Sequence, residues 1–66
     1  MQNSIKVERA RKDITQEALA QAVGVSRQTI ISVESGKYIP STILALKIPR
    51  LFHKNVETIF TLDPKD

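Results

Sequence analysis

The sequence predicts an all-α domain of five helices, and three observations lead to this prediction. Apolar residues recur every three or four positions along nearly the whole chain, which is the spacing of one helix face. Threonine, serine or asparagine precedes several of these segments, where its side-chain oxygen can cap a first turn. Glycine follows two of them, at positions where a helix commonly ends. The first helix is predicted over Asn3–Lys12.

The second helix is predicted over Gln16–Val23, with Thr15 as its N-cap and Gly24 as the residue that ends it. Ile14 precedes the cap, and Leu19 is the fourth helical residue. These two apolar residues fit a hydrophobic staple, which fixes the angle at which the chain enters the helix.

The third helix is predicted to follow the N-cap Ser26 and to run to Ser35, with Gly36 ending it. Val25 and Ile30 form a second hydrophobic staple around this cap. Because the connection between the second and third helices is so short, they are predicted to form a tight helix–turn–helix over about residues 16–35.

The fourth helix is predicted to open at Pro40 and Ser41 and to reach Phe52. Pro49 lies inside it, where proline removes one backbone hydrogen bond and costs about 3 kcal/mol unless the helix kinks. We therefore expect a bend near residues 45–48, and we expect Pro49→Ala to raise the melting temperature.

Asn55 is predicted to cap a short fifth helix that reaches Phe60. His53, just past the fourth helix, is predicted to end that helix, because histidine tolerates positive φ better than most residues. Residues 60–62 alternate between apolar and polar, so a short C-terminal strand that pairs with its symmetry mate is compatible with the pattern.

The length limits what the chain can be. A chain of 66 residues forms one domain, predicted over residues 1–66, and buries only about 60% of the surface that its unfolded form exposes. It has no cysteine and one histidine, so helix packing or oligomerisation must stabilise it, and we expect a dimer. The net charge of +3 is too small to establish a polyanionic partner by itself.

No apolar run reaches the roughly 20 residues that a membrane span needs, and the N-terminus lacks the apolar stretch of a secretion signal. We therefore expect a cytoplasmic protein with no membrane partner. His53 stands without the carboxylates, serine or further histidines that catalysis or metal binding needs, so the sequence indicates neither an enzyme nor a metal site or cofactor.

The third helix has two contrasting faces. Ile30 and Val33, one helical step apart, are predicted to point into the core, and Ala20 is predicted to lie where the second and third helices cross. The outward face then carries Arg27, Gln28, Ile31, Ser32 and Ser35. A braced helix that presents such a face has the arrangement needed to enter the major groove of DNA.

Three segments carry a specific resemblance: residues 14–20 (ITQEALA), residues 23–30 (VGVSRQTI), and residues 33–38 with Pro40 and Ser41 (VESGKY, PS). They resemble the Cro/lambda-repressor-like, or XRE-type, helix-turn-helix regulators, above all the short members with little beyond the DNA-binding domain. The resemblance covers nearly the whole chain. It implies a five-helix domain, two-fold dimers, and operator binding that usually represses transcription.

The resemblance also implies roles for individual residues. Arg27 and Gln28 match the main groove-reading positions, where arginine can pair with guanine and glutamine with adenine. Ser32 belongs to the same base-reading face. Ile31 departs from the family pattern, which often has a polar residue there. It is either a reader of a thymine methyl group or an ordinary exposed apolar residue.

Residues beside this face match phosphate-contacting positions: Gln16, Thr29, Lys37 and Tyr38. Arg9 and Glu34 match a pair that in this family forms an ion pair between the first and third helices, which orients the recognition helix without touching a base. The dimer contact is expected at about residues 49–62, with Leu51, Val56, Ile59, Phe60 and Leu62, although these apolar residues could instead complete the core of a monomer.

The resemblance therefore implies two partners, a double-stranded DNA operator and a second copy of the chain, and no small-molecule ligand. A second hypothesis keeps the same scaffold for a different role, as an antitoxin or another module whose main partner is a protein. That role predicts an exposed apolar surface that the dimer leaves uncovered.

Overall fold

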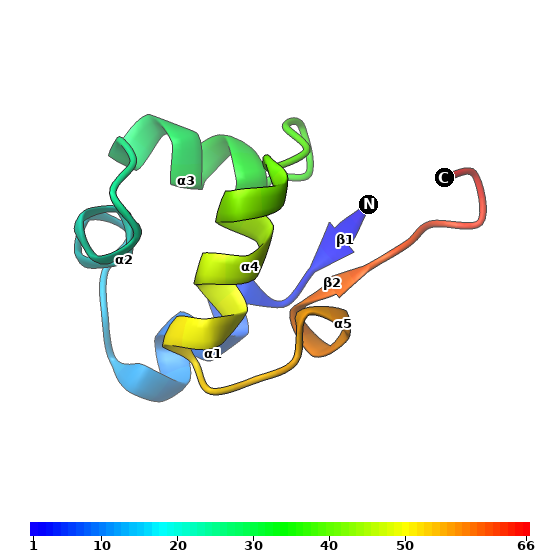
Figure 1. Ribbon diagram of the computed structural model, residues 1–66. Coiled ribbons are helices and arrows are strands. Elements are labelled where there is room, and N and C mark those ends of the chain that lie inside the picture. Colours follow the sequence, from blue (N-terminus) through cyan, green and yellow to red (C-terminus); the bar gives the residue numbers. More distant parts are fainter.

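The computed structural model describes all 66 residues, from Met1 to Asp66. Five helices and two short strands follow one another along the chain: β1 (Gln2–Asn3), α1 (Ile5–Lys12), α2 (Gln16–Val23), α3 (Arg27–Glu34), α4 (Thr42–Leu51), α5 (Val56–Ile59) and β2 (Phe60–Thr61). The predicted five-helix fold is confirmed. In Figure 1, α4 runs through the middle of the domain, with α2 and α3 on one side and the two strands on the other.

Local side-chain chemistry explains where the longer helices begin. The hydroxyl oxygens of Thr15, Ser26 and Ser41 each accept the N–H three residues later, at 3.0, 3.2 and 3.2 Å. Each hydroxyl satisfies one backbone donor that has no partner inside its helix. Asn55 precedes α5 as predicted, but its side chain makes no cap hydrogen bond.

Each of the first four helices is followed, within two residues of its end, by a residue with left-handed backbone conformation. These residues are Asp13, Gly24, Gly36 and His53, with φ of +56°, +78°, +79° and +56°. In each case the next residue's N–H bonds to the carbonyl five positions earlier, which is the pattern of a Schellman motif. The predicted left-handed residues Gly24 and His53 are confirmed, and Asp13 is one that the sequence pattern did not reveal.

A single apolar core lies among the helices. It consists of Ile5, Leu19, Ala20, Val23, Ile30, Val33, Leu44, Ile48, Phe52, Ile59 and Phe60. Ile14 and Val25, the outer members of the two hydrophobic staples, are partly buried against it. The crossing of α2 and α3 therefore rests on packed apolar side chains, and the fully buried Ala20 belongs to this packing.

The C-terminal apolar residues do not share one environment. Ile59 and Phe60, predicted in the dimer contact, are only 1% and 8% exposed in the single chain, so their side chains complete its own core. Apolar side chains buried within one chain have little surface left for a second one, and the part of these two residues in a dimer contact stays a prediction. Leu51 and Val56 pack partly against the same core, and Leu62 is 72% exposed.

The predicted C-terminal strand exists over Phe60–Thr61, but its observed partner is the N-terminus of the same chain. β1 and β2 run antiparallel, with Gln2 opposite Thr61 and Asn3 opposite Phe60. Because the backbone of residues 2 and 3 is extended to form this pairing, α1 begins at Ile5, two residues later than predicted.

Pro49 does not break α4, which continues to Leu51. The proline lies in the last part of the helix, and its side chain is fully buried. Its ring therefore takes part in packing, which the sequence pattern did not indicate. None of the helices combines the length and the apolar composition that crossing a membrane requires.

Candidate nucleic-acid interface

The two faces of α3 differ sharply in exposure. Ile30 and Val33 are at most 1% exposed and face the core. On the outward face, Arg27, Gln28 and Ser35 are exposed, whereas Ile31 and Ser32 are half-buried. The predicted division of the helix into a core face and a free polar face therefore agrees with the burial of its residues.

A hollow of about 590 Å³ lies between the start of α2 and the start of α3. It is lined by Arg9, Ile14, Thr15, Gln16, Glu17 and Arg27. The first N–H groups of a helix have no intrahelical partner and carry partial positive charge, so the start of α2 favours an anion here. Gln16 and Arg27, distant in the sequence, thus share one hollow and can offer donors to a phosphate, whereas the Glu17 carboxylate in the same lining opposes an anion.

A second, smaller hollow of about 170 Å³ lies beside the first turns of α3. It is lined by Ser26, Gln28, Thr29, Ser32 and Tyr38. Hydroxyl and amide groups dominate this lining, and such groups bind phosphate and sugar oxygens or base edges. The predicted contacts Gln28, Thr29, Ser32 and Tyr38 therefore come together, whereas Ile31 and the exposed Lys37 line neither hollow.

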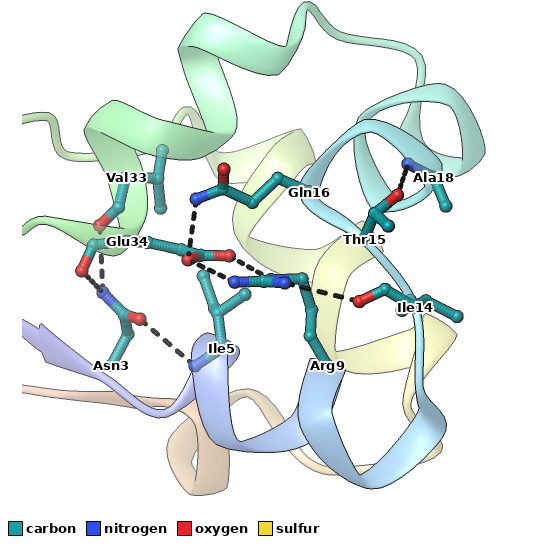
Figure 2. A network of polar contacts seen from close by, with 9 residues as sticks. All are labelled: Asn3, Ile5, Arg9, Ile14, Thr15, Gln16, Ala18, Val33 and Glu34. Atoms are coloured by element: carbon teal, nitrogen blue, oxygen red, sulfur yellow. Dashed lines mark hydrogen bonds and ion pairs between the residues drawn. The ribbon is translucent and has the colours of Figure 1, made fainter.

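Glu34, at the end of α3, is the centre of a polar network that Figure 2 shows. Arg9 Nε lies 2.6 Å from Glu34 Oε2, and Arg9 Nη2 lies 3.0 Å from Glu34 Oε1. Arg9 Nη1 also donates to the carbonyl of Ile14 at 3.3 Å. The side chains of Arg9 and Glu34 are only 15% and 8% exposed, so this two-point ion pair joins α1 to α3 away from bulk water.

Gln16 belongs to the same network. Its Nε2 donates to Glu34 Oε1 at 3.3 Å, and Gln16 is half-buried. An amide nitrogen has two protons, so this bond leaves the second one free for another acceptor. Glu34 therefore orients a side chain that the sequence predicted only as a phosphate contact.

Asn3 is a residue of this region that the sequence analysis missed. Its side chain contacts the last turn of α3 and the first turn of α1 in Figure 2. The sequence placed Asn3 in a helix, and the only available signal was the preference of asparagine for helix starts. His53 is exposed just past the end of α4, and no group of acidic and histidine residues could hold a metal ion.

Comparison with known proteins places this geometry in a family. The helix-turn-helix family model matches residues 5–59. An uncharacterised HTH-type transcriptional regulator of Methanocaldococcus jannaschii is 53% identical over 60 residues, which cover 91% of both chains. Uncharacterised regulators of the same type from Bacillus subtilis and Archaeoglobus fulgidus are 44% and 48% identical over 66 residues, all of this chain and 100% and 93% of theirs. The chain therefore belongs to the XRE-type helix-turn-helix family of transcriptional regulators, which bind DNA.

Proposed function

We propose that this protein is a homodimeric repressor that reads a near-palindromic operator. In this proposal α3 of each subunit enters the major groove, and the two half-sites lie about 34 Å, one helical turn, apart. The observation that carries the proposal is the geometry of α3: a free polar face, an apolar face buried in the core, and an ion pair that anchors its end.

The base-reading roles in this proposal follow from side-chain chemistry. Arg27 and Gln28 are exposed at the start of α3, the end that a recognition helix brings to the bases. Arginine can bind guanine O6 and N7 with two hydrogen bonds, and glutamine can do the same with adenine N6 and N7. Ser32 lies one turn further along, and we assign Ile31 to a thymine methyl group.

The phosphate contacts flank these residues. Gln16 lines the hollow at the start of α2, where the helix favours an anion, and Thr29 and Tyr38 line the smaller hollow. Lys37 is exposed just beyond α3. Contacts of this kind set the orientation of the protein on DNA and make its affinity fall as the salt concentration rises.

We assign the contact between subunits to the apolar residues near the C-terminus that the core leaves partly accessible: Leu51, Val56 and Leu62. The 72% exposure of Leu62 supports this assignment. A dimer bound to two successive half-sites would cover the DNA between them and exclude another protein from it, which is the physical basis of the repressor role.

A gel-shift titration with the DNA that flanks the gene tests this proposal. We expect retardation by the wild type that weakens with salt, and a loss of about 1–3 kcal/mol of binding free energy for each of Arg27→Ala and Gln28→Ala. Gln21→Ala, an exposed change on α2 that lines neither hollow and lies outside the predicted dimer contact, serves as the control and should bind like the wild type. Unchanged binding by both α3 variants would remove this helix from the DNA interface.

One observation favours a second candidate function, a module whose main partner is another protein. Ile39, Ile43 and Leu46 are 68%, 67% and 56% exposed, and the last two share the outer face of α4. Sedimentation equilibrium of wild type and Ile43→Ser/Leu46→Ser tests whether the dimer covers this face. A dimer that persists in the variant shows that this face lies outside the subunit contact, which is the uncovered apolar surface that the second candidate predicts.

A further inference from the structure

The side chain of Asn3 joins the ends of two helices from a position on β1. Its Nδ2 donates to the carbonyl of Val33 at 2.9 Å and, at a longer distance of 3.5 Å, to that of Glu34. Its Oδ1 accepts the N–H of Ile5 at 3.2 Å. One amide group therefore meets carbonyls in the last turn of α3 and an N–H in the first turn of α1, as Figure 2 shows.

The Ile5 N–H has only Asn3 as its acceptor. The Val33 carbonyl, by contrast, also accepts the Gly36 N–H at 3.1 Å and gains a second bond from Asn3. The last carbonyls and the first N–H groups of a helix have no intrahelical partner. Ser4, which immediately precedes α1, makes no side-chain cap hydrogen bond, so Asn3 supplies the acceptor instead. The asparagine amide carries its donor and its acceptor on separate atoms of one planar group, whereas the carboxylate of aspartate only accepts and the single hydroxyl of serine is shorter, so either residue could reproduce only part of the arrangement.

The backbone of Asn3 is held in place by the sheet. It belongs to β1, where Asn3 lies opposite Phe60 of β2. Phe60 is only 8% exposed and belongs to the core. The hydrogen bond from Asn3 to Val33 therefore connects the end of α3 to a sheet that is itself anchored, and it does so separately from the Arg9–Glu34 ion pair.

We propose that Asn3 is a positioning residue for DNA reading, because it holds the last turn of α3 against the β1–β2 sheet and so sets the placement of Arg27 and Gln28. This inference rests on the proposed function, since it concerns the same recognition helix. Asn3 itself contacts no base in this account. Its loss would let α3 shift against the rest of the domain, and base contacts tolerate such shifts less well than phosphate contacts do.

The test compares wild type, Asn3→Asp, Asn3→Ser and the control Ser4→Ala. Asn3→Asp keeps the acceptor for Ile5 but places a negative charge against the Val33 carbonyl, whereas Asn3→Ser loses the reach of the amide. Affinity is measured for a selected operator and for a scrambled duplex, at a temperature where circular dichroism shows each variant fully folded. We expect both Asn3 variants to lose about tenfold in the ratio of these affinities, the size of one mismatched base contact, and Ser4→Ala to keep it.

A merely structural cap would lower the melting temperature of the Asn3 variants and leave the affinity ratio unchanged, and that result overturns the inference. If Asn3→Asp does not fold, Asn3→Ser carries the test. Hydrogen exchange separates this inference from the proposed function: the amides of Gly36 and Lys37, which bond to carbonyls in the last turn of α3, should exchange faster in both variants without any DNA. A wild type that prefers no DNA sequence contradicts the proposed function, whereas unchanged exchange contradicts the role of Asn3.

Discussion

The outward face of α3 and the end of the same helix are built in opposite ways. On the outward face, Arg27 and Gln28 stand exposed. At the end, Glu34 is 8% exposed and bonds to Arg9 and Gln16, while the Val33 carbonyl bonds to Asn3. The polar groups at the end of the helix are used within the protein, and those on its outward face remain available to a ligand.

This difference teaches how a domain of 66 residues can bind a target with one short helix. An ordered helix loses less conformational entropy on binding than a mobile one. Fixing the end of α3 therefore raises the affinity that the contacts of its outward face can give. Changes at the end of α3 should therefore reduce stability, and changes on its outward face should alter DNA binding at constant stability.

The largest effect is expected from Glu34→Ala. Arg9 is only 15% exposed, so its guanidinium would remain largely buried without its carboxylate. Breaking a buried ion pair in this way costs about 3 kcal/mol or more, which urea denaturation should record as a lower midpoint.

The matched control is the pair between Glu8 and Arg11, whose 3.2 Å separation is similar but whose arginine is 65% exposed. Glu8→Ala should cost less than Glu34→Ala, because the Arg11 guanidinium that it leaves unpaired is 65% exposed and stays solvated. Arg11→Ala is not a suitable control, because it would leave unpaired a Glu8 carboxylate that is only 8% exposed. Equal losses in Glu8→Ala and Glu34→Ala would show that burial of the Arg9–Glu34 pair carries no special weight.

On the outward face, Ile31→Asn should lower the free energy of unfolding by less than a core substitution does, because Ile31 is half-buried and lies outside the core cluster. We expect it to lose the preference for thymine at one base-pair step per half-site, worth about 1 kcal/mol or more. Competition binding with operators changed at single base pairs measures this. A variant with an unaltered preference at every step would make Ile31 an ordinary half-buried apolar residue with no part in reading DNA.

Pro49→Ala is expected to raise the melting temperature, but by less than the restored backbone hydrogen bond alone would. Restoring the hydrogen bond to the Ala45 carbonyl recovers about 3 kcal/mol. The buried proline ring would lose carbon atoms, each worth about 0.8 kcal/mol when buried, so the net gain is about 1 kcal/mol. Differential scanning calorimetry decides the sign, and a lower melting temperature would mean that packing of the ring outweighs the missing hydrogen bond.

The smallest effect concerns the two termini. The Met1 ammonium lies 3.0 Å from Asp63 Oδ2 and 3.1 Å from Asp66 Oδ2. Hydrogen bonds to Asp63 and then Asp66 raise the pKa of this ammonium above its usual 8.0. The Asp63 N–H and then the ammonium lower the pKa of the Asp66 carboxyl below its usual 3.8.

The pH dependence follows from these two directions. The stabilisation from the raised ammonium pKa is complete below pH 8.0 and is lost as the pH rises through its folded-state pKa. The stabilisation from the lowered Asp66 pKa is complete above pH 3.8 and is lost as the pH falls through the folded-state pKa of Asp66. In an NMR titration, the chemical shifts of the Asp63 and Asp66 amides should stay constant between pH 3.8 and pH 8.0 and change outside this range. The chemical shifts of the α3 amides should not follow these changes. Movement of the Asp66 amide near pH 6 would contradict this.

The longer helices could be predicted because local sequence determines their ends. Thr15, Ser26 and Ser41 cap first turns within three residues, and Gly24 and Gly36 provide the positive φ that ends a helix. Such signals need no knowledge of the rest of the fold. Asp13 escaped prediction because its left-handed conformation depends on how the chain must leave α1, and aspartate carries only a weak preference for it.

The missed features all depend on residues far apart in the chain. β1 has two residues, too few for an alternating pattern, and it pairs with residues nearly at the other end of the sequence. Ile59 and Phe60 have the same apolar character as an interface residue, so only their burial identifies them as core. The outward face of α3 could be read from helical periodicity, whereas the Asn3 and Gln16 contacts to its end could not.

Selection of bound DNA from a random pool tests whether the outward face of α3 reads a two-fold site. We expect a near-palindrome with half-sites about 10 base pairs apart. We also expect Gln28→Ala, selected in parallel, to relax the preference at one position in each half-site and to leave the spacing unchanged. A selected sequence without two-fold symmetry, or one that is identical for the wild type and Gln28→Ala, would show that α3 does not read the DNA in this way.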